Sequence, residues 1–169
     1  MMVREAILFN REECEFLINS ASGYYDSMVN HGYVSNVRTS LEADIEIKGE
    51  VKELLLQKLS SFGVQTLPET FKVIKYRVGG EFFRHKDNSS KHNADRYMSV
   101  SIQLSDTYEG GDLSVWENDT KFTASKAIGN TVMFNSGLSH QAFPVELGTR
   151  YAGVIWLSLE NMGKTRVLL

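Results

Sequence analysis

Cysteine is almost absent from this chain of 169 residues: Cys14 is the only one, so no disulfide can form within it. Structural disulfides belong mainly to oxidising compartments, so we expect the cytoplasm or another intracellular space. Long apolar runs are also lacking, and none approaches the roughly 20 residues that span a bilayer. The start, Met1 to Glu5, has an acidic residue and no secretory-signal pattern. The sequence therefore predicts a soluble protein without a membrane partner.

A surplus of positive charge is lacking too. Lysine and arginine number 18 against 21 aspartates and glutamates, which gives a net charge of −3. General nucleic-acid binding needs a basic face that displaces counterions from phosphates, so nucleic acid is not an expected partner. One local basic cluster does occur, and its simplest interpretation is a solvated loop, with the rim of a site as the alternative. Its members are Arg84, Lys86, Lys91, His92 and Arg96.

Length and composition indicate a single domain, 1–169. A chain of this length that is 42% hydrophobic and 23% charged can bury a sizeable core without disulfides or a structural metal. In a helical N-terminal part, about 1–66, apolar spacing predicts helices over 11–21 and 50–62. Asn10 is a suitable N-cap for the first helix, and Gly63 ends the second. Neither helix carries a chemical constellation, so both are expected to be supports.

After Pro68 the hydrophobic period changes from 3.6 residues to two. The clearest alternation, at 97–105, predicts a half-buried strand. Further strands are expected at 34–39, 71–78, 81–87, 112–117, 121–124, 131–135, 139–145 and 150–159. Many short strands joined by glycine-rich turns predict a double-sheet β core over about 70–160, so the fold class is α+β.

A candidate metal site stands at the end of the strand expected over 81–87. His85 and Asp87 are two residues apart, and alternate side chains of a strand point the same way. Two histidines and one carboxylate on one face of a metal leave three coordination positions open, which is typical of non-haem Fe(II) oxygenases. The pair alone is a weak signal, and a further histidine must come from another strand.

Three other histidines are present. His31 lies outside the expected β core, and His92 falls in a polar loop, where a solvated surface histidine is the simpler interpretation. His140 opens the strand expected over 139–145 and is the natural candidate. The alternative is a histidine that only hydrogen-bonds backbone at a strand start.

Arg150 favours the metal hypothesis. It follows His140 by ten residues across a turn at Gly148, so a hairpin would bring both to the same end of neighbouring strands. Its strand face, shared with Trp156, is largely apolar, and an arginine there needs a planar anionic partner. A short dicarboxylate ligand held by two parallel hydrogen bonds satisfies it best. The alternative is a structural ion pair with Glu146.

A polar strand face extends the candidate pocket. Ser99, Ser101 and Gln103 lie opposite the apolar side of the strand at 97–105. Small neutral polar residues suit a wet ligand pocket better than an outer surface. Tyr76 either donates a hydroxyl to this pocket or is an ordinary core tyrosine.

Taken in order, these residues resemble the Fe(II)- and 2-oxoglutarate-dependent dioxygenases, specifically the prolyl 4-hydroxylase-like branch. The resemblance runs from about Val37 to Glu160, some three quarters of the chain. Its motifs are Tyr76-x-x-Gly79, Phe82-x-x-His85-x-Asp87, Arg96 with Ser99 before Gln103, Gly110-Gly111-Asp112-Leu113, Gly129-Asn130-Thr131, His140 with Pro144-Val145, and Gly148-Thr149-Arg150 with Trp156. Each motif is weak alone, whereas the ordered set is specific.

The resemblance implies a double-stranded β-helix, or jelly roll, with N-terminal helices packed on the larger sheet. It implies Fe(II) held by His85, Asp87 and His140, with 2-oxoglutarate as cosubstrate, O2 as oxidant and ascorbate as a candidate reductant. The cosubstrate pocket it implies contains Arg150, Tyr76, Gln103, Leu113, Ser101 and Trp156. Many relatives have a tyrosine where this chain has Gln103, and often a threonine where it has Leu113.

The expected activity is hydroxylation of proline in a peptide or protein, with release of succinate and CO2. The alternatives are an oxygenase acting on a free amino acid or other small molecule, a non-catalytic jelly-roll binding module, and a zinc hydrolase. The polar loop at 88–95 is expected to close over the substrate. Residues of this lid or rim are Arg84, Asn88, Lys91 and Arg96. The sequence leaves the oligomeric state open.

Overall fold

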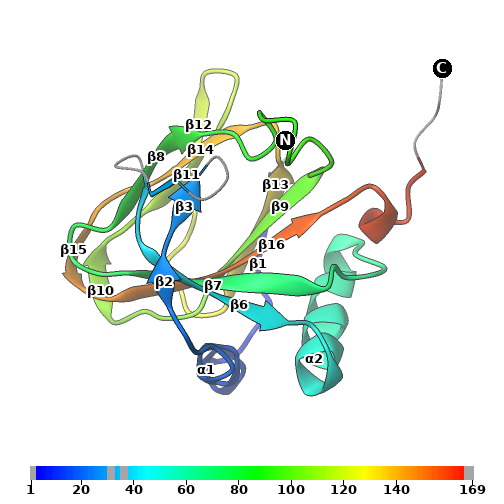
Figure 1. Ribbon diagram of the computed structural model, residues 1–169, viewed down its shortest axis with the longest axis horizontal. Coiled ribbons are helices and arrows are strands. Elements are labelled where there is room, and N and C mark those ends of the chain that lie inside the picture. Colours follow the sequence, from blue (N-terminus) through cyan, green and yellow to red (C-terminus); the bar gives the residue numbers. More distant parts are fainter. Residues whose placement is uncertain (1–2, 30–32, 35–37, 166–169) are drawn as a thin grey trace.

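Two antiparallel sheets form the body of the protein in a computed structural model, which describes residues 3–29, 33–34 and 38–165 (Figure 1). Among these residues, the larger sheet has the strand order β1 (Val3–Ile7), β13 (Asn130–Asn135), β9 (Met98–Gln103), β16 (Arg150–Leu157), β7 (Thr70–Tyr76), β6 (Leu41–Glu46) and β2 (Tyr25–Asp26). The smaller sheet has the order β12 (Thr120–Thr123), β11 (Leu113–Glu117), β14 (Ser139–Ala142), β8 (Glu81–His85) and β5 (Arg38–Thr39). Two short strand pairs join β10 (Tyr108–Gly110) to β15 (Val145–Gly148) and β3 (Met28–Val29) to β4 (Tyr33–Val34).

Both predicted helices are present. The first, α1 (Arg11–Asn19), begins with a reciprocal cap: Glu13 N–H donates to Asn10 Oδ1 at 2.8 Å, and Asn10 N–H donates to Glu13 Oε1 at 2.9 Å. The second, α2 (Gly49–Leu59), runs into the 3-10 turn η1 (Ser60–Phe62) and ends at Gly63, whose φ is +87°. A further turn, η2 (Glu160–Met162), follows β16. In the described part of the chain, no helix combines the length and apolar character needed to cross a bilayer.

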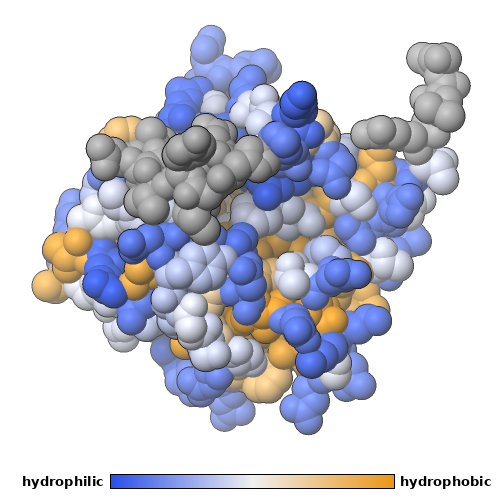
Figure 2. Space-filling model, in the orientation of Figure 1, coloured by the Kyte–Doolittle hydropathy of each residue, from blue (hydrophilic) through white to orange (hydrophobic). Residues whose placement is uncertain are grey.

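The main core lies between the helices and the larger sheet. Leu17 of α1 and Leu55 of α2 are fully buried there, together with Val100, Ile102 and Leu104 from one side of β9 and its extension. Figure 2 shows hydrophobic side chains gathered where the helices meet the adjoining strands, whereas much of the remaining face is hydrophilic. The alternation at 97–105 therefore has the predicted consequence: its apolar side packs on the helices, and its polar side faces the interior between the two sheets.

The N-terminal part differs from the expectation of a helical segment over about 1–66. It also supplies β1, β6 and β2 to the larger sheet, where β1 pairs with β13 and β6 pairs with β7. In β6, Ala43 and Ile45 are buried. On its other side, Glu42 and Asp44 accept hydrogen bonds from Lys72 at 2.8 and 2.9 Å. The alternation of polar and apolar residues at 41–46 is a strand signal, although no strand was predicted there.

Several strand predictions need correction at their ends. The strand expected over 81–87 stops at His85, so Asp87 lies beyond it. The segment expected as one strand over 139–145 is divided, because Pro144 has no N–H to give to a ladder; β14 ends at Ala142 and β15 begins at Val145. The strand expected over 34–39 lies partly outside the described residues, which show Tyr33–Val34 and Arg38–Thr39 as separate short strands. His31 also lies outside the described residues.

Among the described glycines, Gly129 has the closest backbone neighbour. Leu8 N–H donates to Gly129 O at 3.1 Å, and Gly129 N–H donates to Gln103 O at 2.7 Å, so this residue joins the N-terminal segment to the larger sheet. Its φ is +77°, and a Cβ built on it would lie 1.7 Å from Phe9 O. Only glycine fits here without movement of the main chain.

We predict that Gly129→Ala lowers the free energy of unfolding by at least about 4 kcal/mol, the range reserved for severe backbone or core disruption. Gly79→Ala is the matched control, because Gly79 has a φ of +83° and no atom within 4 Å of its Cβ position. It should lose only the cost of the left-handed backbone, about 1–2 kcal/mol. Urea unfolding followed by circular dichroism compares the two variants, and equal losses would contradict the steric argument.

Candidate metal centre and cosubstrate pocket

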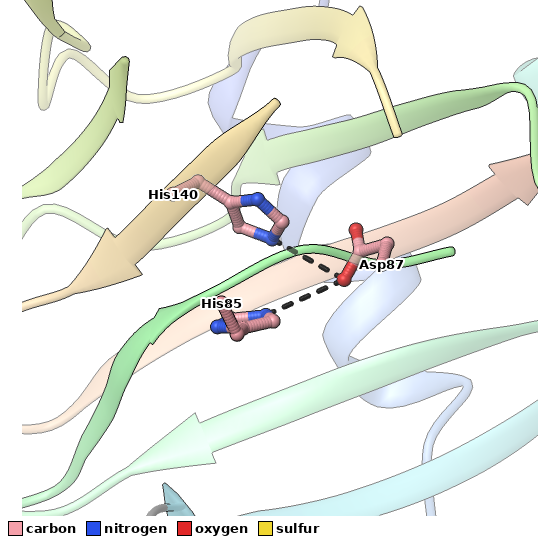
Figure 3. A group of neighbouring side chains, drawn as sticks. All are labelled: His85, Asp87 and His140. Carbon is pink, nitrogen blue, oxygen red and sulfur yellow. Dashed lines mark ion pairs between the residues drawn. The ribbon is translucent and has the colours of Figure 1, made fainter. Parts of the chain in front are cut away.

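Three side chains from two neighbouring strands converge between the sheets. His85 is the last residue of β8, His140 lies opposite it on β14, and Asp87 follows β8 by two residues. Asp87 Oδ1 lies 3.4 Å from His85 Nε2 and 3.2 Å from His140 Nε2 (Figure 3). Within the described ranges this is the one group of at least three metal-ligating residues, with its ligand atoms all within 4.8 Å of one another. The structure thus brings together the three residues predicted as metal ligands.

The backbone orients both imidazole rings toward this point. Nδ1 of His85 lies 2.7 Å from Phe83 O, and Nδ1 of His140 lies 3.1 Å from Leu138 O. A carbonyl can only accept, so Nδ1 of each ring carries a proton, and Nε2 is the ring nitrogen that faces Asp87. Metal-ligating histidines are commonly oriented in this way by the other ring nitrogen. The two Nε2 atoms are therefore available as ligands on the side of Asp87.

Burial and charge shift the pKa values of Asp87 and His85 in the direction that metal binding needs. Burial would raise the pKa of Asp87, but His140, together with hydrogen bonds from both histidines and Ser99, holds that pKa well below its usual range. Burial also lowers the pKa of His85, and the neighbouring His140 lowers it further, although Asp87 opposes the shift. Asp87 is therefore an anion. His85 tends toward the neutral imidazole that metals bind.

A pocket of about 510 Å³, including its open mouth, extends from these ligands between the two sheets. Its lining includes five of the six residues predicted for the cosubstrate pocket, namely Tyr76, Ser101, Leu113, Arg150 and Trp156. Arg150 and Trp156 share one face of β16 with Ala152 and Val154, as their sequence parity predicted. The predicted metal ligands and the predicted anion-binding arginine therefore line one cavity.

Arg150 is buried, with 3% of its surface exposed, and its Nε has no hydrogen-bond partner. The guanidinium lies 5.0 Å from the centroid of the Tyr76 ring. Among the residues that the structure describes, no carboxylate forms an ion pair with it, so the predicted alternative of a bridge to Glu146 is not observed. A buried cation with an unpartnered donor fits a ligand carboxylate.

Gln103 lies away from the main pocket. It lines an adjoining pocket of about 240 Å³, and its Nε2 donates to Ser105 O at 3.2 Å and to the Tyr108 hydroxyl. Tyr108, which sequence reasoning did not single out, also contacts Arg150: burial raises the pKa of Tyr108, and the charge and a hydrogen bond of Arg150 partly offset the rise. Tyr108 precedes the Gly110-Gly111 turn, and this position is the only local signal that could have placed it near the pocket.

The predicted rim residues divide between two sides of the smaller sheet. Arg96 lies over the Trp156 ring at 3.8 Å and donates to Asp87 O at 3.4 Å, so it sits beside the metal ligands. Arg84 points to the outer face instead, where it donates to Ser139 Oγ at 3.0 Å, because it precedes His85 on β8 and neighbouring strand residues face opposite sides. Asn88 donates to Arg96 O at 3.5 Å, and Lys91 is exposed.

The chain belongs to the 2OG-Fe(II) oxygenase superfamily, whose model matches residues 71–158, more than half of the sequence. It is therefore an Fe(II)- and 2-oxoglutarate-dependent dioxygenase that uses O2, as the resemblance predicted. The two imidazoles, the carboxylate and the buried arginine fit this iron and cosubstrate. The family assignment decides against the binding-module and zinc-hydrolase alternatives.

Particular relatives are PKHD-type hydroxylases. The one from Stutzerimonas stutzeri (strain A1501) is 28% identical over 100% of this chain and 84% of its own length. The one from Shewanella sp. (strain MR-7) is 26% identical over 99% and 84%.

Solved structures share the fold. A Pseudomonas putida prolyl-4-hydroxylase superposes with a TM-score of 0.68 at 17% identity, covering 93% of this chain and 92% of that one. A Trichoplax adhaerens prolyl hydroxylase, in complex with a hypoxia inducible factor oxygen degradation domain peptide fragment, has a TM-score of 0.71 at 16% identity and covers 96% and 86%. These likenesses confirm the predicted jelly-roll core.

Proposed function

We propose that this dioxygenase hydroxylates proline in a peptide or protein substrate. In this proposal His85, Asp87 and His140 hold the Fe(II). Arg150 binds the distal carboxylate of 2-oxoglutarate, with Tyr76 and Tyr108 beside it. One observation carries the assignment: three converging ligand atoms and a buried arginine with an unpartnered Nε line the same cavity. The relatives named as PKHD-type hydroxylases and the prolyl hydroxylases of the same fold support proline as the substrate side chain.

The bound iron, with 2-oxoglutarate and O2, supplies the oxidation of a substrate C–H bond and yields succinate and CO2. The chain's own residues position the reactants and exclude water. The Arg150 guanidinium would neutralise the distal carboxylate of 2-oxoglutarate. Because Arg150 is buried and part of the pocket lining is apolar, this ion pair would be strong. Leu113, Phe134 and Ala142 give the same cavity an apolar part of its lining. The cavity therefore offers the Arg150 cation to one end of the cosubstrate and the proposed metal ligands to the other end.

The substrate would enter at the mouth beside Trp156. Arg96 stacks on this ring and donates a hydrogen bond to the backbone carbonyl of Asp87, so this one side chain connects Trp156 to a proposed metal ligand. The loop at 88–95 begins one residue after Asp87 and consists of turns and bends. We include it in the proposal as the segment that closes over the substrate, with Asn88 and Lys91 at its surface.

The proposal predicts that the iron-loaded enzyme adds one oxygen atom to proline-containing peptides and does not oxidise free proline at a comparable rate. Mass spectrometry of a panel of proline-containing peptides, the same peptides with alanine in place of proline, and free amino acids measures this directly. Succinate release that depends on the peptide shows coupling to the cosubstrate. Oxidation of a free amino acid, with every peptide left unchanged, would contradict the peptide assignment and favour the small-molecule alternative.

A further inference from the structure

Asp87 lies beyond the end of β8, so no strand ladder holds the carboxylate that completes the metal site. Two buried serines hold it instead. We infer that Ser99, supported by Ser136, is a positioning residue that fixes Asp87 to offer a single oxygen to the metal. The inference rests on the proposed metal site and names residues outside the ligand set.

The contacts form a closed hydrogen-bonded ring. Asp87 N–H donates to Ser136 O at 3.0 Å, Ser136 Oγ lies 2.9 Å from Ser99 Oγ, and Ser99 Oγ donates to Asp87 Oδ2 at 2.6 Å. Ser136 is itself held by its N–H, which donates to Tyr97 O at 3.0 Å. The ring thus ties the metal carboxylate, both by backbone and by side chain, to β9 and to the turn after β13.

The direction of each hydroxyl proton follows from the chemistry of the ring. An ionised carboxylate can only accept, so the one proton of the Ser99 hydroxyl goes to Asp87 Oδ2. Ser99 must then accept in its contact with Ser136, and the Ser136 proton points to Ser99. Each donor polarises the next, which strengthens the last bond of the chain. Ser99 and Ser136 are 2% and 0% exposed, so water does not compete for these bonds.

The ring separates the two oxygens of Asp87. Oδ2 is engaged by Ser99, whereas Oδ1 faces the two imidazole nitrogens at 3.4 and 3.2 Å. A carboxylate held in this way would offer Oδ1 alone to a metal, and two imidazoles with one such oxygen would leave three coordination positions for the cosubstrate and O2. Without Ser99, Asp87 could rotate and bring both oxygens to the metal, or move away with its loop.

The test is a titration with Mn(II) alone, followed by the loss of the electron paramagnetic resonance signal of the aqueous ion, so activity is not involved. We expect Ser99→Ala to weaken Mn(II) binding by about 10- to 100-fold, as outer-shell partners of metal ligands typically do. Ser136→Ala removes only the supporting donor and should have a smaller effect of the same sign. Ser99→Thr keeps the hydroxyl and should recover most of the affinity lost in Ser99→Ala.

Ser114→Ala is the matched control. Ser114 is 1% exposed and hydrogen-bonds Thr123 Oγ1 at 2.9 Å, so it loses a comparable buried bond away from the metal ligands. Its Mn(II) affinity should equal that of the unmodified protein, and melting temperatures identify any variant that is merely unstable. Folded Ser99→Ala protein that binds Mn(II) with unchanged affinity would overturn the role of Ser99. Failure of the unmodified protein to bind Mn(II) would instead overturn the proposed metal site.

Discussion

Replacement of Asp87 by alanine is expected to reduce 2-oxoglutarate turnover by at least about 1,000-fold, equivalent to about 4 kcal/mol in the activation barrier. Asp87 is the one anionic member of the three-residue group, and its Oδ1 lies within 3.4 Å of both imidazole Nε2 atoms. Alanine leaves only the two imidazole rings, which hold Fe(II) weakly, and it also breaks the hydrogen bond from Ser99. Succinate release at saturating 2-oxoglutarate measures the loss of turnover.

Two further measurements make the Asp87 result specific to the metal. Mn(II) binding should be lost in parallel with turnover, while the far-ultraviolet circular dichroism spectrum stays that of the folded protein. Asp106→Ala is the control, because Asp106 forms an exposed ion pair with Arg11 at 2.7 Å and surface pairs contribute little. It should retain full turnover. An Asp87→Ala enzyme that keeps more than about a tenth of its activity, about 1.4 kcal/mol by the same conversion, would contradict the ligand assignment.

Replacement of Arg150 by leucine is expected to raise the KM for 2-oxoglutarate by about 100-fold, a loss of about 2.7 kcal/mol. The guanidinium is buried and its Nε has no partner, so a ligand carboxylate would supply the missing acceptor. Arg150→Lys keeps the charge but loses the fork that holds two oxygens, and its KM should rise by about 10-fold. Tyr108→Phe removes one hydroxyl beside the guanidinium and should have a smaller effect than either.

The effect of Arg150→Leu should fall on KM, with kcat largely restored at high 2-oxoglutarate and Mn(II) affinity unchanged. This separates cosubstrate binding from metal binding, because Arg150 belongs to the opposite end of the pocket from the three ligands. Arg11→Leu is the control, since it removes an exposed arginine with an ordinary ion pair. An unchanged KM for 2-oxoglutarate in folded Arg150→Leu protein would show that the anion-binding role belongs to another residue.

Local rules were enough for the parts of the site that lie on regular strands. His85 ends β8, His140 is the second residue of β14 and Arg150 opens β16, and alternation predicted which way β16 and β9 would face. Local rules also account for Arg84, which was predicted at the rim of the pocket. It is next to His85 on β8, so alternation directs it to the outer face.

Contacts between distant segments account for most of what the sequence did not predict. Tyr108 reaches Arg150 only because β10 pairs with β15, which ends two residues before that arginine. The strand β1 owes its place to β13, about 130 residues further along the chain. A short edge strand of this kind carries little local signal, because its partner supplies the hydrogen bonds that define it.

The sequence by itself determined the α+β class and the jelly-roll expectation, and it named the three candidate ligands and the candidate arginine, because hydrophobic period and motif order are properties of the chain alone. Only the tertiary structure decided what surrounds Asp87. Ser99 and Ser136 are 12 and 49 positions further along the chain, and no spacing rule relates them. They meet at the Asp87 carboxylate because β9 and the turn after β13 fold beside the end of β8. Both serines are buried there, so their hydroxyl groups bond to each other and to Asp87 instead of to water.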